Sequence, residues 1–407
     1  GTHTSSGNLN FDFDDKPLVI MGDDCNTCTP DSTIIDAGGR NRHFTFDSGE
    51  DSTYQIIGLT LYNGKVTGNY SGGSVMVRNN SNPKFKKVVF KSNAAENDNW
   101  EGGGAVHINW SSAVFYDCRF ESNVVDRTAE ASNNRAEGGG LFVYGHNKGN
   151  PITRVVRCTF NGNVAKGRSS AYGGALSVYE APIHVINSLF YNNTTRANVG
   201  SDKSDNSHGG AITLQGPSTH NGSDWEASEA RLINCTIVNN SALSDRSNTY
   251  TSSGALRFES WGNRKETFYM FNNIIWGNLI SNPGSSDQAQ VYISGNDGSM
   301  TWNNDYNTVQ DISTFGSDAG DHSNDYDPQF TNSAGNDFTL SDASHLIGAG
   351  IATFEGVNAP EKDITNITTR GTPPDIGAYE NALSVSPYPA PVKNLTGFPG
   401  GGSANLS

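Results

Sequence analysis

The sequence is poor in the features that mark several protein classes. Only 34% of its 407 residues are hydrophobic, and 27 basic against 42 acidic residues give a net charge of −15. Phosphate binding needs a basic surface, so this charge argues against nucleic acid as the main partner and disfavours, without excluding, a polyanionic substrate. No apolar run approaches the roughly 20 residues of a membrane helix, so membrane insertion is not expected. No signal peptide is present, which indicates a mature chain or an excised fragment.

Cysteine is also scarce. Two of the five cysteines form the C-x-x-C pair Cys25 and Cys28, and three stand alone at Cys118, Cys158 and Cys235. A C-x-x-C motif indicates a redox or zinc site only with a βαβ context or a second ligand pair, and neither is visible. We therefore predict a small Cys25–Cys28 disulfide in a secreted protein. The three single thiols are expected to be packed in a core and not to be catalytic.

Glycine, by contrast, is abundant, with 46 residues, and Val, Ile and Phe are placed regularly between the glycine clusters. A compact sphere of this length would use more apolar residues, and a disordered chain would lack the regular apolar positions. The class that remains is an elongated solenoid. Its thin core needs few apolar residues per coil, and its corners use Gly and Asn.

One pattern recurs along most of the chain: a glycine cluster, two short alternating apolar runs and a closing asparagine. The residues after the glycines are Ser74, Ala105, Leu141, Ala175, Ala211 and Ala255, and the closing asparagines are Asn93, Asn123, Asn163, Asn193, Asn240 and Asn278. Period-two alternation predicts short strands, and parallel coils stack about 4.8 Å apart. We therefore predict an all-β fold, a single-stranded right-handed parallel β-helix with irregular caps and long inter-coil loops. The closing asparagines should stack and satisfy buried backbone groups.

The same alternation assigns columns of side chains to the core or to the outside. We expect inward columns at Val75, Val106, Phe142, Leu176, Ile212 and Leu256 and at Tyr116, Val156, Ile186, Ile233 and Phe271. We expect an outward column at Met76, His107, Val143, Ser177, Thr213 and Arg257. Lys86 falls at an inward position, which implies a bulge.

The repeat predicts one β-helix domain over residues 1–380. Its N-terminal cap and first coil occupy 1–50, and degenerate C-terminal coils and a cap occupy 279–380, with coils continuing to about Glu380. The caps protect the ends of the stack from edge-to-edge aggregation. Residues 381–407 are rich in Pro and Gly and are typical of a linker, which we expect to lead to a further C-terminal domain.

Two family resemblances follow from these motifs. GGAV (103–106), GGAL (173–176) and GGAI (209–212), with FKSN (90–93), FESN (120–123), FNGN (160–163) and FYNN (190–193), resemble the GGA[ILV] and FxxN repeats of polymorphic outer-membrane proteins. DPQF, DFTLSDASHLIGAG and PDIGAYE, with GTHTSS, TIIDAGG and IIGLTLYNG, resemble bacterial choice-of-anchor Q surface proteins. Together the resemblance spans about 1–380. It implies an extracellular β-helix on the outer cell surface, held by a separate C-terminal anchoring or sorting domain, without a defined catalytic constellation.

Enzymatic alternatives have few candidate residues. A hydrolase needs converging carboxylates, but Asp23–Asp24 stands alone and Gly145–Asn147 is only a fragment of the polygalacturonase-type motif set. A uronate lyase needs a base and a cation that neutralises the substrate carboxylate. Arg78, Lys86 and Lys87 are the candidates, within a basic run that would otherwise serve solubility.

Binding candidates are of two kinds. The acidic loop offers carboxylate oxygens for a structural Ca²⁺, and no other cofactor is expected. Its candidate ligands are Asp318, Asp321, Asp325 and Asp327, with Asn324 between them. Aromatic faces stack on sugar C–H groups, although they also shield the ends of a thin core. The candidate ligand-binding residues are His107, Trp110, Trp225 and Trp261.

We therefore expect a secreted or cell-surface β-helix module that acts in adhesion without catalysis. It would bind a glycan or another surface protein through variable loops near 94–104, 124–138, 195–210 and 241–253. One alternative is a polysaccharide lyase or glycoside hydrolase on the lateral face of the β-helix. Another is a passive spacer in a long surface fibre.

Overall fold

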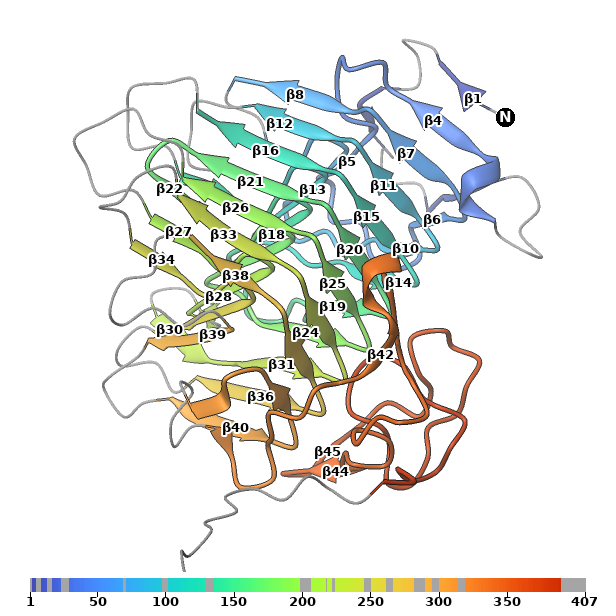
Figure 1. Cartoon of the computed structure of the whole chain (residues 1–407). Coiled ribbons are helices and arrows are strands. Elements are labelled where there is room, and N and C mark those ends of the chain that lie inside the picture. Colours follow the sequence, from blue (N-terminus) through green and yellow to red (C-terminus); the bar gives the residue numbers. More distant parts are fainter. Residues whose placement is uncertain are drawn as a thin grey trace, which may run out of the picture.

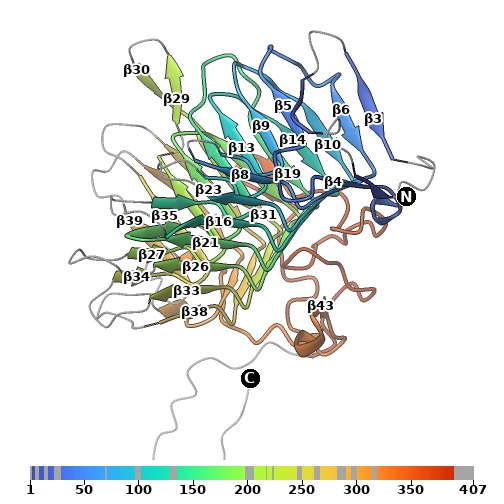
Figure 2. The same cartoon turned by 90° about the horizontal axis from the view of Figure 1, so that it is seen from above.

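The chain forms the expected parallel β-helix (Figures 1 and 2). The computed structural model describes residues 2–4, 9–12, 17–22, 29–68, 71–96, 102–128, 135–197, 206–216, 218–221, 224–244, 250–260, 266–281, 290–294, 300–313 and 319–388. Each coil places one strand in each of three or four long parallel sheets, and the middle coils add a strand to a shorter fifth sheet. No helix in the described ranges is long and apolar enough to span a membrane.

We number the sheets by the order in which one coil visits them. Sheet 1 contains β2 (Phe11–Asp12), β5 (Phe44–Phe46), β9 (Val75–Val77), β13 (Val106–Asn109), β18 (Leu141–Tyr144), β23 (Leu176–Tyr179), β28 (Ile212–Gln215), β35 (Leu256–Glu259) and β39 (Val291–Ser294). Sheet 2 contains β3 (Val19–Met21), β6 (Gln55–Ile57), β10 (Lys84–Lys86), β14 (Val114–Tyr116), β19 (Thr153–Val156), β24 (Ile183–Ile186), β31 (Glu229–Ile233), β36 (Thr267–Phe271) and β40 (Thr301–Asp305).

The chain then crosses three further sheets. Sheet 3 contains β1 (Thr2–His3), β4 (Ile34–Asp36), β7 (Thr60–Tyr62), β11 (Val89–Lys91), β15 (Arg119–Glu121), β20 (Thr159–Asn161), β25 (Leu189–Tyr191), β32 (Thr236–Val238), β37 (Ile274–Trp276) and β41 (Thr308–Val309). Sheet 4 contains β8 (Lys65–Thr67), β12 (Ala94–Glu96), β16 (Val124–Arg127), β21 (Val164–Gly167), β26 (Thr194–Ala197), β33 (Ser241–Ser244) and β38 (Leu279–Ile280). Sheet 5 contains β17 (Arg135–Glu137), β22 (Ser170–Tyr172), β27 (Asn206–His208) and β34 (Tyr250–Ser252), and an antiparallel pair, β29 (Ser218–Asn221) and β30 (Asp224–Ala227), lies between β28 and β31.

The core is a column of stacked aromatic rings. Phe90, Phe120, Phe160 and Phe190 are fully buried, with successive ring centres 4.7, 4.4 and 4.7 Å apart. This spacing matches the distance between neighbouring strands of a sheet. Identical side chains in register therefore give a thin solenoid a continuous apolar core.

The closing asparagines form the predicted ladder. Asn123 is fully buried, and its side-chain amide donates to Asn163 Oδ1 at 2.9 Å and to the carbonyl of Phe90 at 2.9 Å. Asn163 donates to Asn193 in the same way, and its side chain satisfies the carbonyl of Phe120 and the backbone amide of Asn123 in the preceding coil. The ladder runs from Asn93 to Asn278, and this prediction is confirmed.

The predicted facing of one column, that of Tyr116, is wrong. In β14 the buried residue is Phe115, and Tyr116 lies on the outer face, as do Val156, Ile186, Ile233 and Phe271 in register with it. The cause is Asp117, whose φ of 56° turns the chain between sheets 2 and 3 and breaks the alternation. Lys86, one residue before the equivalent corner, is exposed on the outer face and not at an inward bulge.

The glycine cluster before β18 is also shifted by one residue. Leu141 pairs with Val106, so Leu141 and Val143 face inward and Phe142 lies in the outward column beside His107. Glycine is required in this cluster because a side chain would clash with the neighbouring backbone. A Cβ on Gly138, whose φ is 61°, would lie 2.2 Å from the carbonyl oxygen of Leu141.

The coils end earlier than predicted. Parallel pairing stops at β41 and the bridge between Thr308 and Asn324, and the following chain does not continue to Glu380 as coils. Residues 327–388, here called the C-terminal lobe, contain the antiparallel pairs β42 (Phe330–Asn332) with β43 (Asp337–Leu340) and β44 (Thr353–Phe354) with β45 (Val357–Asn358). The lobe lies along the side of the solenoid, against the outer faces of sheets 2 and 3 (Figures 1 and 2).

Asparagines at the corner between sheets 2 and 3 hold the lobe. Asn187 donates to the carbonyl of Lys362, Asn234 to that of Asp375 at 3.2 Å, and Asn272 to that of Ile351 at 2.8 Å. Apolar contacts accompany these bonds, because the outward-facing Ile233 and Phe271 are covered by lobe residues. The lobe thus buries apolar residues of the outer face that the sequence-based alternation had wrongly placed in the core.

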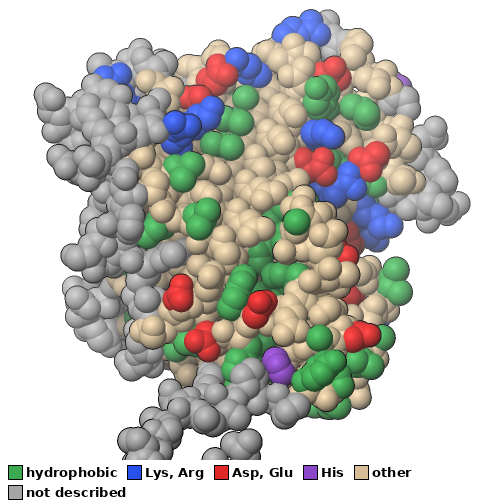
Figure 3. Space-filling view, viewed as in Figure 1, with side chains coloured by type: hydrophobic (Ala, Val, Ile, Leu, Met, Phe, Trp, Pro, Cys, Tyr) green, Lys and Arg blue, Asp and Glu red, His purple; other side chains and the backbone are tan. Residues whose placement is uncertain are grey.

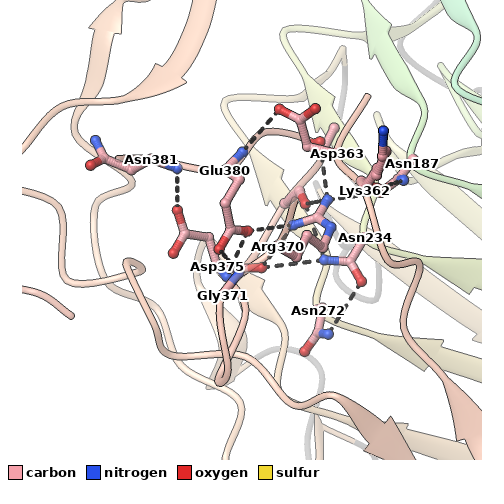
Figure 4. Close-up of polar contacts among 12 residues, drawn as sticks. Asn187, Asn234, Asn272, Lys362, Asp363, Arg370, Gly371, Asp375, Glu380 and Asn381 are labelled. Atoms are coloured by element: carbon pink, nitrogen blue, oxygen red, sulfur yellow. Dashed lines mark hydrogen bonds and ion pairs between the residues drawn. The ribbon is translucent and has the colours of Figure 1, made fainter. Parts of the chain in front are cut away.

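Arg370 lies at the centre of the docking contacts (Figure 4). Its side chain is only 3% exposed and donates to Glu380 at 3.0 Å, to Asn187 Oδ1 at 2.7 Å and to the carbonyl of Gly377 at 2.9 Å. Asp375, beside it, accepts hydrogen bonds from the backbone amides of Gly348 and Asn381. The motif PDIGAYE is therefore a structural latch between lobe and solenoid.

Candidate functional site

The line along which the C-terminal lobe contacts sheets 2 and 3, here called the seam, contains an open pocket of about 400 Å³. Solenoid residues and lobe residues contribute opposite walls. The lining residues are Val238, Asn239, Trp276, Gly277, Asp327, Gln329, Phe330, Ser333 and Phe338. We call this the Trp276 pocket. A cavity of this size, part apolar and with a few polar groups, is typical of a small-ligand site.

Trp276 supplies the aromatic surface of the pocket. It is the last residue of β37 and lies on the outer face of sheet 3, paired with Val238 of the previous coil. Phe330 and Phe338 of the lobe hairpin lie against the same cluster of apolar residues, and their rings meet edge to face with centres 5.4 Å apart. The indole is only half-buried, so part of it remains available to a ligand.

Local backbone geometry positions the polar rim. Asn239, Gly277 and Gln329 all have φ between 51° and 67°, so each sits at a sharp corner from which its neighbours point outward. The backbone amide of Gly277 donates to Gln310 Oε1 at 2.7 Å, and Asp327 Oδ1 accepts from the backbone amide of Gln329 at 2.9 Å. The corner next to Trp276 and the start of the lobe hairpin are therefore each fixed by a hydrogen bond.

The rim side chains have unused hydrogen-bonding capacity. Within the part of the chain that the structure describes, the side chains of Asn239, Gln329 and Ser333 and the indole N–H of Trp276 make no hydrogen bond, and Asp327 uses only one carboxylate oxygen. Donors and acceptors thus surround an indole. This arrangement suits a ligand that is apolar on one face and carries hydroxyl groups around its edge.

The lyase candidates do not converge. Arg78 directly follows β9 and is paired with Asp47 at 2.7 Å, whereas Lys86 is the exposed last residue of β10. Lys87 occupies the next corner, with a φ of 51°, and lines a different groove of the seam. The structure therefore does not place these three side chains in one site.

The calcium candidates are dispersed as well. Asp321, Asp325 and Asp327 are exposed, while Asp318 lies outside the described residues. Among the described residues no group of three or more His, Cys, Asp or Glu side chains is placed to hold a metal ion. Asp327 instead lines the Trp276 pocket.

None of the aromatic candidates lines the Trp276 pocket. They lie at sheet 1, or they fall wholly or in their side chains outside the described residues. His107 is fully buried, stacked on Phe142 with ring centres 5.1 Å apart, and burial lowers its pKa to about 3. It does not face a ligand, which corrects the prediction. Trp110 is half-buried against Gly145 at the end of sheet 1. Trp261 lies outside the described residues, and for Trp225 the structure describes only its backbone in β30.

His107 is buried because sheet 5 covers the outer face of sheet 1 through a buried ionic network. The Arg135 guanidinium lies 3.9 Å from the centre of the Tyr172 ring and pairs with Glu137 and Gln215. Burial raises the pKa of Glu137, an effect that the Arg135 charge opposes. Glu137 is 1% exposed and also accepts from Ser177, so its carboxylate serves to join the sheets.

Of the five cysteines, three lie in the described part of the chain and two lie outside it. Cys118, Cys158 and Cys235 are free and buried, as expected of core residues. Burial raises the pKa of Cys235 to about 12, so it is not a nucleophile at neutral pH. Cys25 and Cys28, like Asp23 and Asp24, lie outside the described residues, and the disulfide stays a prediction.

No family model, curated protein or solved structure matches this chain. The resemblance to polymorphic outer-membrane proteins and to choice-of-anchor Q proteins therefore stays a prediction. The function has to be inferred from the geometry of the chain itself.

Sequence reasoning missed the Trp276 pocket although part of it was visible. Trp276 falls in the last position of the F-x-x-N strand, where earlier coils carry Lys91, Glu121 and Asn161, and such a position must face outward. The lobe wall was not visible, because residues 327–340 were expected to form further coils.

Proposed function

We propose that the chain is a glycan-binding β-helix module of the cell surface that acts in adhesion and holds a sugar unit in the Trp276 pocket. The observation that carries this proposal is the partly exposed indole, next to amide and hydroxyl side chains that make no hydrogen bond within the described residues and to a carboxylate with one unused oxygen. A pyranose has C–H faces that stack on an aromatic ring and equatorial hydroxyl groups that need donors and acceptors at its edge. The pocket offers both.

Binding without catalysis is favoured by the chemistry of the lining. Hydrolysis of a glycosidic bond needs two carboxyl groups on either side of that bond. Asp327 is the single carboxylate among the lining residues of the pocket. A uronate lyase would need a cation there, and the lining contains none. The spacer alternative does not account for unpaired polar groups around a partly exposed indole.

The test compares aromatic variants in a glycan-binding assay. Trp276→Ala should abolish binding to whichever glycans of an array the wild-type protein retains, and Trp276→Phe should keep part of it, because a ring still supplies the stacking surface. Asp327→Asn and Gln329→Ala should each weaken binding about tenfold, as expected for one lost hydrogen bond.

Trp110→Ala is the matched control, since Trp110 is half-buried at the far side of the solenoid. Its binding should equal that of the wild type. Full binding by Trp276→Ala would overturn the proposal, and so would the release of new reducing or unsaturated ends from the bound glycan.

A further inference from the structure

A second groove lies at the end of the seam nearest the N-terminal coils and has a volume of about 500 Å³. Its solenoid wall contains Lys87, Asp117, Arg119 and Arg157, and its lobe wall contains residues 364–367 and Tyr379. We call it the Arg157 groove. It shares no lining residue with the Trp276 pocket.

The solenoid wall comes from the corner column between sheets 2 and 3. All members of this column have positive φ and point away from the core; in chain order they are Lys87, Asp117, Arg157, Asn187, Asn234 and Asn272. The three asparagines bind the lobe through their side-chain amides. The column therefore changes from asparagines that bind the lobe to charged side chains that line the groove.

The charged wall is rich in hydrogen-bond donors and poor in free acceptors. Arg157 donates from Nε and one terminal nitrogen to the two oxygens of Asp117, at 2.6 and 3.2 Å, so that carboxylate is occupied. Arg119 donates from Nε to Glu121 at 2.9 Å and from one terminal nitrogen to Asp31 at 2.5 Å. Each guanidinium has five N–H groups, so both keep donors that these carboxylates do not use.

The local charge contrasts with the rest of the chain. The lining holds three cationic side chains and one carboxylate in a protein of net charge −15, and Glu121 and Asp31 pair with Arg119 next to it. Figure 3 shows that, on the face that carries the lobe, lysine and arginine side chains lie over the N-terminal coils, interspersed with acidic ones, while the lower part carries apolar and acidic side chains. An anionic group would therefore find cationic side chains at this end of the seam, whereas the lining of the Trp276 pocket contains none.

The opposite wall is partly apolar, because Ile364 and Ile367 lie there beside Thr365, Asn366 and Tyr379. Ile364 packs against the lobe–solenoid contact, and Ile367 is 81% exposed at the rim of the groove. Burial raises the pKa of Tyr379 to about 12, so its hydroxyl stays neutral and is not a competing anion. A ring that carries a carboxylate would meet donors on one side and apolar side chains on the other.

We propose that the Arg157 groove binds the carboxylate-bearing unit of an acidic glycan. This inference rests on the proposed function, because it names the class of glycan that the module selects. The carboxylate accepts hydrogen bonds from the unused guanidinium N–H groups of Arg119 and Arg157, and the sugar ring packs on Ile364 and Ile367. The Trp276 pocket holds a neutral unit, so the two sites would select glycans that contain both kinds of sugar.

The test uses calorimetry with three oligosaccharides of one backbone: neutral, carboxylated and sulfated. The wild-type protein should bind the carboxylated form about ten- to hundredfold more tightly than the neutral one, as expected for charge-assisted hydrogen bonds. This preference should shrink as salt is added. If the sulfated form binds as much more tightly than the neutral form as the carboxylated one does, the proposal that the groove selects a carboxylate is wrong.

The variants Arg157→Gln and Arg119→Gln should remove the preference while keeping the affinity for the neutral form. Arg154→Gln is the matched control, because Arg154 is exposed on β19 of the same coil and does not line the groove. Melting temperatures of all three variants report whether each one folds. Folded Arg157→Gln and Arg119→Gln proteins that keep the preference would refute the inference.

The two proposals fail in different ways. If the neutral and carboxylated forms bind equally and Trp276→Ala abolishes both, the Arg157 groove proposal is wrong and the Trp276 pocket proposal stands. If no oligosaccharide binds, a saturation-transfer NMR measurement with a free uronic acid isolates the groove. A signal that Arg157→Gln abolishes then supports the groove alone, and the absence of a signal refutes it.

Discussion

Replacement of Arg370 by methionine should undock the C-terminal lobe without unfolding the solenoid. Methionine keeps the apolar length of the side chain but removes donors to Glu380, Asn187 and the carbonyls of Gly377 and Ala378. Glu380 is 4% exposed, so its charge would be left buried without its partner. Removal of one member of a buried pair costs about 3–5 kcal/mol.

The assay is urea unfolding followed by two probes. Trp276 lies at the seam, so the part of the tryptophan fluorescence that is lost when Trp276 is also replaced by Phe reports the lobe contact, whereas far-ultraviolet circular dichroism reports mainly the strands of the solenoid. We expect a fluorescence transition at lower urea in Arg370→Met, and limited proteolysis should cut within 327–388 first. The double variant Arg370→Met/Glu380→Gln should recover part of the loss, because no charge remains buried. A loss below about 1 kcal/mol would contradict the role of Arg370 as a latch, since surface pairs cost that little.

Three further predictions follow from buried polar groups. Burial raises the pKa of Asp375 to about 7. The folded chain therefore binds more protons than the unfolded chain between about pH 4 and pH 7, so this contribution to stability, about 4 kcal/mol at most, falls as the pH rises through that window. Asp375→Asn should remove this pH dependence from lobe docking, as measured by proteolysis at pH 5 and pH 8. Burial lowers the pKa of His107 to about 3, so its contribution is complete above pH 6.5 and is lost as the pH falls, by about 1.4 kcal/mol per pH unit. The slope of unfolding free energy against pH below 6 should therefore decrease in His107→Phe, and an unchanged slope would refute the assignment. Asn163→Ala removes two donors and two acceptor contacts inside the ladder and should cost about 3–5 kcal/mol in urea unfolding, whereas Asn161→Ala, in the outward position of the same coil, should cost less than 1 kcal/mol.

The sequence was sufficient to predict the β-helix because its determinants are local and repeated. A large apolar residue recurs at the position of Phe120, and asparagine recurs at the position of Asn123 from Asn93 to Asn278, so alternation within β15 and the ladder at its end could be predicted directly. The predicted inward or outward facing was wrong where a single corner residue separates two strands, because that residue shifts the alternation by one position. The positive φ of Asp117 has no single sequence signature, because Lys, Asp, Arg and Asn all occupy that corner.

The lobe could not be predicted for a different reason. Segments such as DFTL (337–340) alternate in the way a coil strand does, yet β43 pairs antiparallel with β42. What decides between the two structures is the apolar outer face of sheets 2 and 3, where Ile233 and Phe271 need cover. Which residues form that face can be decided only when the positions of the corner residues between the strands are known. Half of the Trp276 pocket belongs to the lobe, so the candidate site was hidden together with it.

The central claim is that the seam between solenoid and lobe binds a glycan through Trp276. The most direct measurement is the affinity of wild-type protein, Trp276→Ala and Trp110→Ala for one glycan retained on an array. We predict that Trp276→Ala loses binding by at least about 100-fold while Trp110→Ala and the wild type bind alike, since stacked bases and rings contribute on the order of 1–3 kcal/mol and the rim hydrogen bonds depend on that stacking. Equal binding by all three proteins would contradict the account.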